Sequence, residues 1–187
     1  MGSPGIRAAS EYWLQMEPSR GRIVATTALP GRPRWTVYDA GRDRFLVNVR
    51  DPALVALVDA ESASVVDTWS VSSHGPHGLD LDRLGGRVLV ACDGGHVVCL
   101  SSADGRELGR VQIASEPDAI WFDATTDGLY VAVGRPGVVQ VIDTGRMVVR
   151  ETVATEEGSK TTAVDTRRRV LYVFRPISCS VAAFRVA

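Results

Sequence analysis

The sequence predicts an all-β fold in which about four similar sheets, each of four antiparallel strands, follow one another along the chain. Three observations predict it. A unit of roughly 42 residues recurs along the 187-residue chain. Each unit holds four short β-type segments separated by Gly, Pro and Asp. No window keeps a 3.6-residue apolar period, which excludes an amphipathic helix.

Three independent sets of positions mark the repeat. An aspartate comes before an apolar run in each unit, and a residue inside the run recurs at the same intervals of 43, 41 and 42. A third position near the end of the unit recurs every 42 residues. The three sets are Asp39, Asp82, Asp123 and Asp165; Leu46, Leu89, Tyr130 and Tyr172; and Met16, Val58, Leu100, Ile142 and Phe184. Because the three sets agree to within one residue, the repeat reflects one structural unit. We expect the second set to be buried between adjacent sheets.

The strands are clearest in the best-preserved unit. They are AIWF (119–122), LYVAV (129–133), VVQVI (138–142) and MVVRETV (147–153). The second and third strands are almost entirely apolar, as expected of strands covered on both faces, whereas a fourth strand such as 65–70 alternates with polar residues. Four antiparallel strands with a buried centre and a polar outer edge, repeated about every 40 residues, are typical of a β-propeller blade.

The apolar runs RFLVNV, RVLVAC, GLYVAV and VLYVF resemble the YVTN-type β-propeller repeat. The preceding P-x5-D and the following V-x-V-I-D extend the resemblance, which covers roughly residues 11 to 187. Ser101 and Arg185 depart from the pattern. The resemblance implies a protein that is often exported or displayed at the cell surface, and in many cases has no assigned chemistry.

The strands predict one domain spanning residues 1–187. EYWLQM (11–16) aligns with a third strand and RIVATTA (22–28) with a fourth, three complete units follow, and the last unit ends at its third strand, which makes 17 strands. The approximate units are 11–28, 34–70, 77–113, 118–153 and 160–187.

Three assemblies are compatible with this count. Residues 22–28 can complete the last blade and close a small four-bladed ring, which leaves 11–16 surplus. Alternatively, the chain is a half-propeller that pairs with a second copy into a homodimer of roughly eight blades, or it is part of a longer protein. An open half-ring exposes the apolar faces of its end blades, which favours association.

Composition excludes several function classes. The formal net charge is −1, from 21 basic and 22 acidic residues, so no basic field predicts a nucleic-acid partner. No stretch approaches the roughly 20 apolar residues of a membrane span. The N-terminal residues MGSPGIRAASEYWLQ lack the apolar core of a signal peptide. We therefore expect a cytoplasmic protein, although similar proteins are often exported.

The candidate site is a ring of polar residues at the mouth of the propeller channel. Arg34, His77, Asp118 and Lys160 each precede a repeat aspartate by five residues. Two permanent cations, one imidazole and one carboxylate suit an anionic or zwitterionic ligand. The alternative is that these positions are polar only because loops face water.

The sequence predicts neither a metal nor a cofactor. Cys92, His96 and Cys99 have zinc-like spacing, but a two-residue turn at Gly94-Gly95 pairs Cys92 with Val97 and puts His96 on the opposite face from both cysteines. Three ligands cannot converge from two faces of a sheet. No P-loop, dinucleotide-binding or nucleophile-elbow motif is present.

The function predicted from these features is a non-enzymatic binding or interaction module that contacts its ligand or partner at the channel mouth. The alternative is a propeller enzyme, a lyase or lactone hydrolase, that uses His77 with Asp118. No convergent catalytic set is visible, which favours the binding module. Fold alone does not assign function.

Overall fold

The computed structural model describes residues 12–17 and 19–186, which form 17 strands in five antiparallel sheets. The strands in chain order are β1 Tyr12–Glu17, β2 Arg22–Ala28, β3 Pro33–Asp39, β4 Arg44–Val49, β5 Leu54–Asp59, β6 Ser64–Ser70, β7 Pro76–Asp82, β8 Arg87–Cys92, β9 His96–Ser101, β10 Glu107–Gln112, β11 Pro117–Asp123, β12 Gly128–Val133, β13 Val138–Asp143, β14 Val148–Ala154, β15 Thr162–Asp165, β16 Val170–Arg175 and β17 Ser180–Arg185. The predicted all-β class and its 17 strands are confirmed. Residue 11 of the predicted first strand lies outside the described residues.

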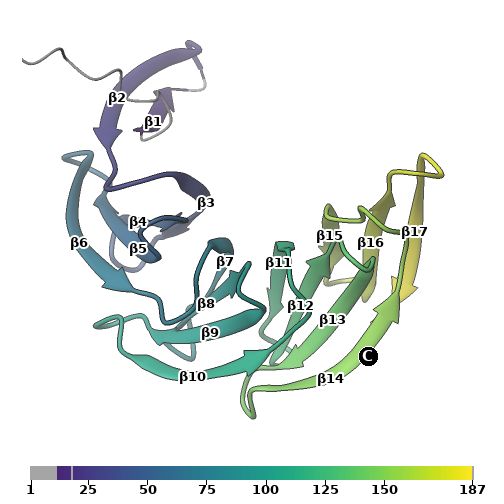
Figure 1. Ribbon diagram of the computed structural model, residues 1–187. Helices are drawn as coiled ribbons and strands as arrows, with labels where there is room; N and C mark the ends of the chain where they lie inside the picture. Colours follow the sequence, from purple (N-terminus) through teal and green to yellow (C-terminus); the bar gives the residue numbers. More distant parts are fainter. Residues whose placement is uncertain (1–11, 18, 187) are drawn as a thin grey trace, which may run out of the picture.

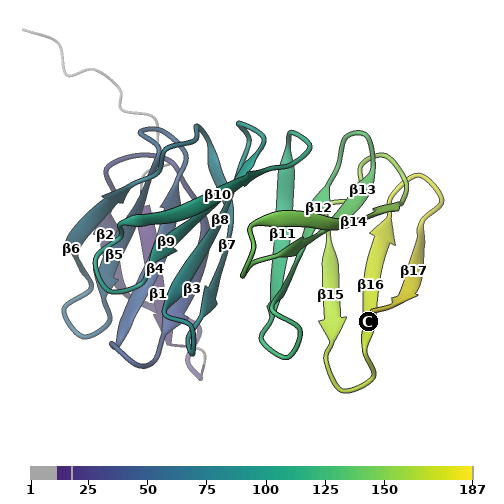
Figure 2. The ribbon, with the colours of Figure 1, turned by 90° about the horizontal axis from the view of Figure 1, so that it is seen from below.

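The sheets stand side by side along an open arc (Figure 1). In the three complete sheets, β3–β6, β7–β10 and β11–β14, the first strand lies on the inside of the arc and the fourth on the outside. The β1–β2 hairpin lies at one end of the arc and the three-stranded sheet β15–β17 at the other (Figure 1). Figure 2 shows the strands of successive sheets from the side of the arc. The chain by itself therefore does not form the closed four-bladed ring, and β2 pairs with β1 rather than with β17.

The core lies between the faces of adjacent sheets. The second strand β8 and the third strand β9 are almost fully buried, whereas the outer strand β14 is exposed along nearly its whole length. Leu46, Leu89 and Tyr130 are buried as predicted, at 0%, 0% and 3% exposure. The same prediction is wrong for Tyr172, which is 36% exposed. None of the five described sheets covers the face on which Tyr172 lies.

The repeated aspartate closes the turn after each inner strand. Oδ1 of Asp39, Asp82 and Asp123 accepts a hydrogen bond from a backbone N–H two or three residues further on. All three carboxylates are buried, so these bonds satisfy charges that water cannot reach. The local turn chemistry therefore explains why the aspartate recurs.

Two arginines at the start of second strands join neighbouring sheets. Arg44 donates to the carbonyl of Ser102, and Arg87 donates to the carbonyl of Thr144, in each case on the following sheet. Arg87 is also paired with Asp82 of its own sheet and Asp127 of the next. These contacts link the sheets at the end of the strands away from the predicted site.

The β8–β9 hairpin corrects one predicted register. Cys92 pairs with His96, not Val97, because the turn has three residues (93–95) rather than two. Cys99 pairs with Leu89, so the two cysteines lie on opposite faces of the sheet and Cys92 shares a face with His96. Among the residues that the structure describes, no three His, Cys, Asp or Glu side chains are grouped to hold a metal, and no helix could cross a membrane.

Candidate functional site

Three of the predicted rim residues lie at the start of an inner strand, and Lys160 lies two residues before β15. For these three the register with the second strand shifts at this point. In β7, Pro76 pairs with Cys92 and Gly78 with Ala91, which leaves His77 as the extra residue. Equivalent shifts follow Pro33 in β3 and Pro117 in β11, around Arg34 and Asp118. Such bulges redirect a side chain out of the regular ladder and are frequent next to functional sites.

The structure brings Arg34, His77 and Asp118 together from three sheets. The Arg34 guanidinium nitrogen Nη2 lies 2.7 Å from His77 Nε2. Asp118 Oδ1 lies 3.6 Å from the same imidazole nitrogen. The three side chains line a recess of about 330 Å³ together with Pro33 and Trp35. Residues that are 84 positions apart in sequence thus share one small volume.

Lys160 lies in an adjoining recess of about 360 Å³, which also contacts Arg34 and His77. The carbonyl of Lys160 accepts a 3.3 Å hydrogen bond from Ala119, so its inner strand is tied to the preceding one. The further lining residues are Arg50, Asp93, Ser115, Glu116 and Pro117. All four predicted residues therefore line two recesses that share Arg34 and His77.

Sequence reasoning missed Asp93 and Arg50. Asp93 Oδ1 lies 3.2 Å from His77 Nδ1, and its other oxygen forms a 2.8 Å ion pair with Arg50. Both residues directly follow the second strand of a sheet, Arg50 after β4 and Asp93 after β8. The repeat register was the signal that could have found them, because the turn between second and third strands lies at the same end as the entry into the inner strand.

Arg34 Nη2 lies near both ring nitrogens of His77, at 2.7 Å from Nε2 and 3.3 Å from Nδ1, and the shorter contact is to Nε2. A guanidinium has donors only, so Nε2 of His77 accepts the bond from Arg34. The proton of the neutral ring is then on Nδ1, where it is donated to Asp93. The alternative tautomer would point two donors at each other. His77 is 9% exposed, which shields this arrangement from water.

The backbone behind His77 is held rigidly. Asn48, fully buried on β4, donates from Nδ2 to the carbonyls of His77 and Gly78, at 3.1 and 3.0 Å. A Cβ at position 78 would come within 2.3 Å of the Asp118 carbonyl, so only glycine permits this approach of two inner strands. Site geometry thus depends on contacts between sheets.

One donor in the site is unused. Arg34 Nε is buried and has no hydrogen-bond partner among the residues that the structure describes. An unpaired buried donor carries a free-energy cost that a bound acceptor would remove. This atom, the Lys160 ammonium and the carboxylates of Asp118 and Glu116 are the groups that we expect to meet a ligand.

No protein-family model matches this sequence, and no curated protein matches it. A solved structure, Kuenenia stuttgartiensis hydrazine synthase, is similar with a TM-score of 0.78 at 14% sequence identity. The similarity covers 87% of this chain and 49% of that chain. The fold is that of β-propeller blades. This chain therefore spans about half the length of the hydrazine synthase chain that it matches, and at this identity the likeness concerns the fold alone.

Proposed function

We propose that this chain is a non-enzymatic β-propeller binding module of the YVTN-repeat type, which holds a small zwitterionic or anionic ligand at its channel mouth. The observation that carries the proposal is the convergence of Arg34, His77, Asp118 and Lys160 at the entry to four successive inner strands. Bulges at three of these positions, and the glycine that allows two strands to approach, support the view that these side chains do more than face water.

The chemistry of the recess selects the ligand class. Arg34 and Lys160 attract a carboxylate or phosphate, and Arg34 offers its unpaired Nε as a directed donor. Asp118 and Glu116 line the same two recesses and suit an ammonium group. A molecule with both charges, such as an amino acid, uses both sides of the site.

Calorimetric titration with glutamate, succinate and inorganic phosphate tests this function. We expect at least one probe to bind with a Kd of about 1 mM or tighter, and Arg34→Gln to weaken binding about tenfold. Arg168→Gln, which removes an exposed guanidinium elsewhere, is the matched control. Absence of binding by all three probes, or equal affinity in Arg34→Gln, would overturn the proposal.

A second candidate function is a lyase or lactone hydrolase that uses His77 as a general base. The observation favouring it is the Asp93–His77 pair, because a carboxylate on Nδ1 leaves Nε2 as the proton acceptor. Asp93, rather than the Asp118 predicted from the sequence, is the carboxylate closer to the imidazole. Turnover of simple lactones that is lost in both His77→Gln and Asp93→Asn would establish the enzyme, and equal rates in wild type and variants would exclude it.

We also propose that the module functions within a larger ring, in which a second copy of the chain supplies the remaining blades. The open arc and the incomplete sheets at both of its ends support this proposal. Light scattering at micromolar concentration is the test. A mass twice the 20.1 kDa of one chain would support pairing, and a mass of 20.1 kDa would refute it.

A further inference from the structure

The last sheet leaves uncovered a face that every complete sheet buries. Tyr172, Phe174 and Val181 lie on this face and are 36%, 45% and 62% exposed. The equivalent residues in the three complete sheets are all buried. They are Leu46, Leu89 and Tyr130 for Tyr172; Asn48, Ala91 and Ala132 for Phe174; and Val55, Val97 and Val139 for Val181. The face is therefore equivalent to the others, but no sheet that the structure describes packs against it.

The first complete sheet is only partly covered on its opposite face, where Val47 and Val58 are buried but the edge at Phe45 is open. Phe45 of β4 is only half-buried, whereas the equivalent residues Val88, Leu129 and Leu171 are at most 1% exposed. Tyr38, which packs against Phe45, is 40% exposed. In the part of the chain that the structure describes, the β1–β2 hairpin precedes this sheet, and it has two strands where a complete sheet has four.

The two ends also complement each other in strand number. Among residues 12–17 and 19–186, the sheet β15–β17 has three strands, and β2 lies in the position of a fourth strand with β1 as its one partner. The outer strand β2 contacts β6 as β10 contacts β14. Strand β1 pairs with β2 in the register of a third strand. Trp13 of β1 pairs with Thr27 of β2, just as Val55 of the third strand β5 pairs with Trp69 of the fourth strand β6. In the repeat β17 is also a third strand, so β1 and β17 are alternative partners for the same edge of β2.

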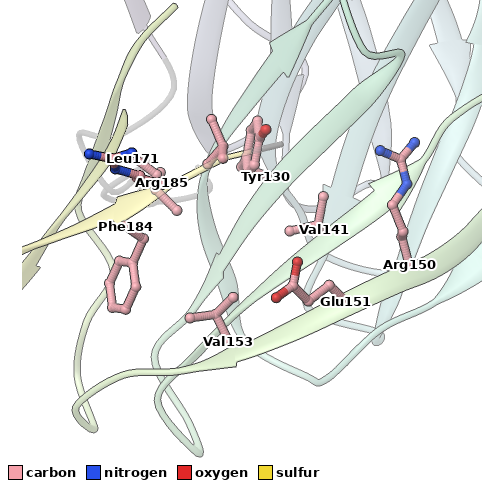
Figure 3. Close-up of a pocket in the computed structure, with 9 residues that line it drawn as sticks. Tyr130, Val141, Arg150, Glu151, Val153, Leu171, Phe184 and Arg185 are labelled. Carbon is pink, nitrogen blue, oxygen red and sulfur yellow. The ribbon is translucent and has the colours of Figure 1, made fainter. Parts of the chain in front are cut away.

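A groove marks the place of the missing strand. A cavity of about 170 Å³ lies between β14 and the last sheet, with Val153 of β14 facing Leu171 and Phe184 (Figure 3). Arg150, Glu151 and Arg185 surround this apolar floor (Figure 3). A fourth strand beside β17 would cover it. Ile23 is half exposed on β2 and is the equivalent of Val65, which packs toward the preceding sheet.

We propose that two copies of this chain join by strand exchange, in which β17 of one copy replaces β1 beside β2 of the other. By the repeat register, Ala183 then pairs with Ala25 of the second copy, as Gln15 pairs with Ala25 within one chain. The Tyr172–Val181 face packs on the Phe45 face of the second copy, and Ile23 of that copy fills the groove. Two identical junctions related by a two-fold axis close a ring of about eight blades.

The strand exchange rests on the proposed pairing of two copies. A disulfide that locks β1 to β2 tests the exchange separately from the pairing, because it keeps β17 of another copy from replacing β1. Gln15→Cys with Ala25→Cys, in a Cys179→Ser background, places two thiols on paired residues of one hairpin. The remaining Cys92 and Cys99 are buried. We expect a dimer for the Cys179→Ser parent, a monomer for the oxidised double variant, and a dimer again after reduction.

Three results overturn the exchange. A monomeric parent refutes both pairing and exchange. A dimer that persists in the oxidised variant leaves pairing intact but refutes the exchange. A mixture of the Ala183→Cys and Ala25→Cys variants must form a covalent heterodimer on oxidation. Ala163→Cys mixed with Ala25→Cys is the control, because these two positions are not paired in the proposed dimer. If Ala183→Cys and Ala25→Cys form no covalent heterodimer, the proposed register is wrong.

A surface substitution adds an independent measurement. Val181→Asp should raise the dimer dissociation constant by about tenfold or more, since it puts a charge at the centre of the proposed contact. The circular dichroism spectrum should not change, because Val181 is exposed in the single chain. Leu84→Asp, at a position that is 94% exposed, is the matched control. Equal dissociation constants for the two variants would contradict the proposed contact.

Discussion

Arg34, on the inner strand of the first complete sheet, donates a 2.7 Å hydrogen bond to Nε2 of His77 on the inner strand of the next. The contact crosses the boundary between two blades, so the geometry of the site depends on how these blades pack together. The imidazole can accept this bond at Nε2 when its ring proton is on Nδ1, opposite Asp93. The contact also places a permanent cation beside the nitrogen that would act as a base.

The first prediction concerns this tautomer. Long-range ¹H–¹⁵N spectra at pH 8 should show His77 with a protonated Nδ1 and an unprotonated Nε2, because Arg34 can only donate. His77→Gln assigns the signal among the three histidines of the chain. Asp93→Asn should shift the ring toward the other tautomer, since an amide can present a donor to Nδ1. A wild-type ring protonated on Nε2 would contradict the hydrogen-bond assignment.

The second prediction compares two leucines. Leu89→Ala should lower the free energy of unfolding by roughly 2–5 kcal/mol, because the side chain is fully buried between sheets. Leu84→Ala should change it by less than about 0.5 kcal/mol, since Leu84 is 94% exposed. Urea unfolding of both variants provides the measurement. Similar losses for the two would show that the inter-sheet core is placed incorrectly.

The third prediction tests the support behind His77. Asn48→Leu keeps the side-chain size but removes the two buried hydrogen bonds from the Asn48 amide to the carbonyls of His77 and Gly78. We expect a loss of about 1–3 kcal/mol in the free energy of unfolding. Thr68→Val on the exposed strand β6 is the control. An unchanged unfolding midpoint for Asn48→Leu would mean that these bonds add no net stability.

The fourth prediction concerns acid stability. Burial acts to raise the pKa of Asp123, but hydrogen bonds from Thr125 and Thr126 and the charge of Arg169 outweigh it, and the pKa lies below its usual 3.8. The ionised carboxylate therefore stabilises the fold above the unfolded pKa, and this stabilisation is lost as pH falls through the lower folded value. The stability difference between wild type and Asp123→Asn should shrink from pH 7 to pH 3.

For Asp80 we expect the opposite dependence of stability on pH. Burial raises its pKa, although backbone N–H groups of Phe122 and Leu81 and the charge of Arg83 act against the shift. The charged form is then penalised in the fold, so Asp80→Asn should gain stability relative to wild type as pH rises above 3.8. Unfolding curves for the two variants at pH 3, 5 and 7 check both signs. Parallel pH profiles for the two variants would contradict the assignment.

The sequence by itself determined the strands, their order and the grouping into sheets. Strand alternation, Asp-centred turns and a constant repeat length are local properties, and the Asp82 turn can be read from its own neighbours. The same register identified Arg34, His77, Asp118 and Lys160, because equivalent positions in a repeat lie at equivalent places in successive sheets.

Only the tertiary structure decided which of these groups touch. The Arg34–His77 bond and the Asp93–His77 pair join different strands or sheets, and their geometry depends on how far one sheet is rotated against the next. Packing of side chains such as Leu89 and Ile120 between sheets sets that rotation, and strand spacing along the chain does not encode it. For the same reason the repeat predicted a buried Tyr172, whereas the open end of the arc leaves Tyr172 and Val181 without a sheet to cover them.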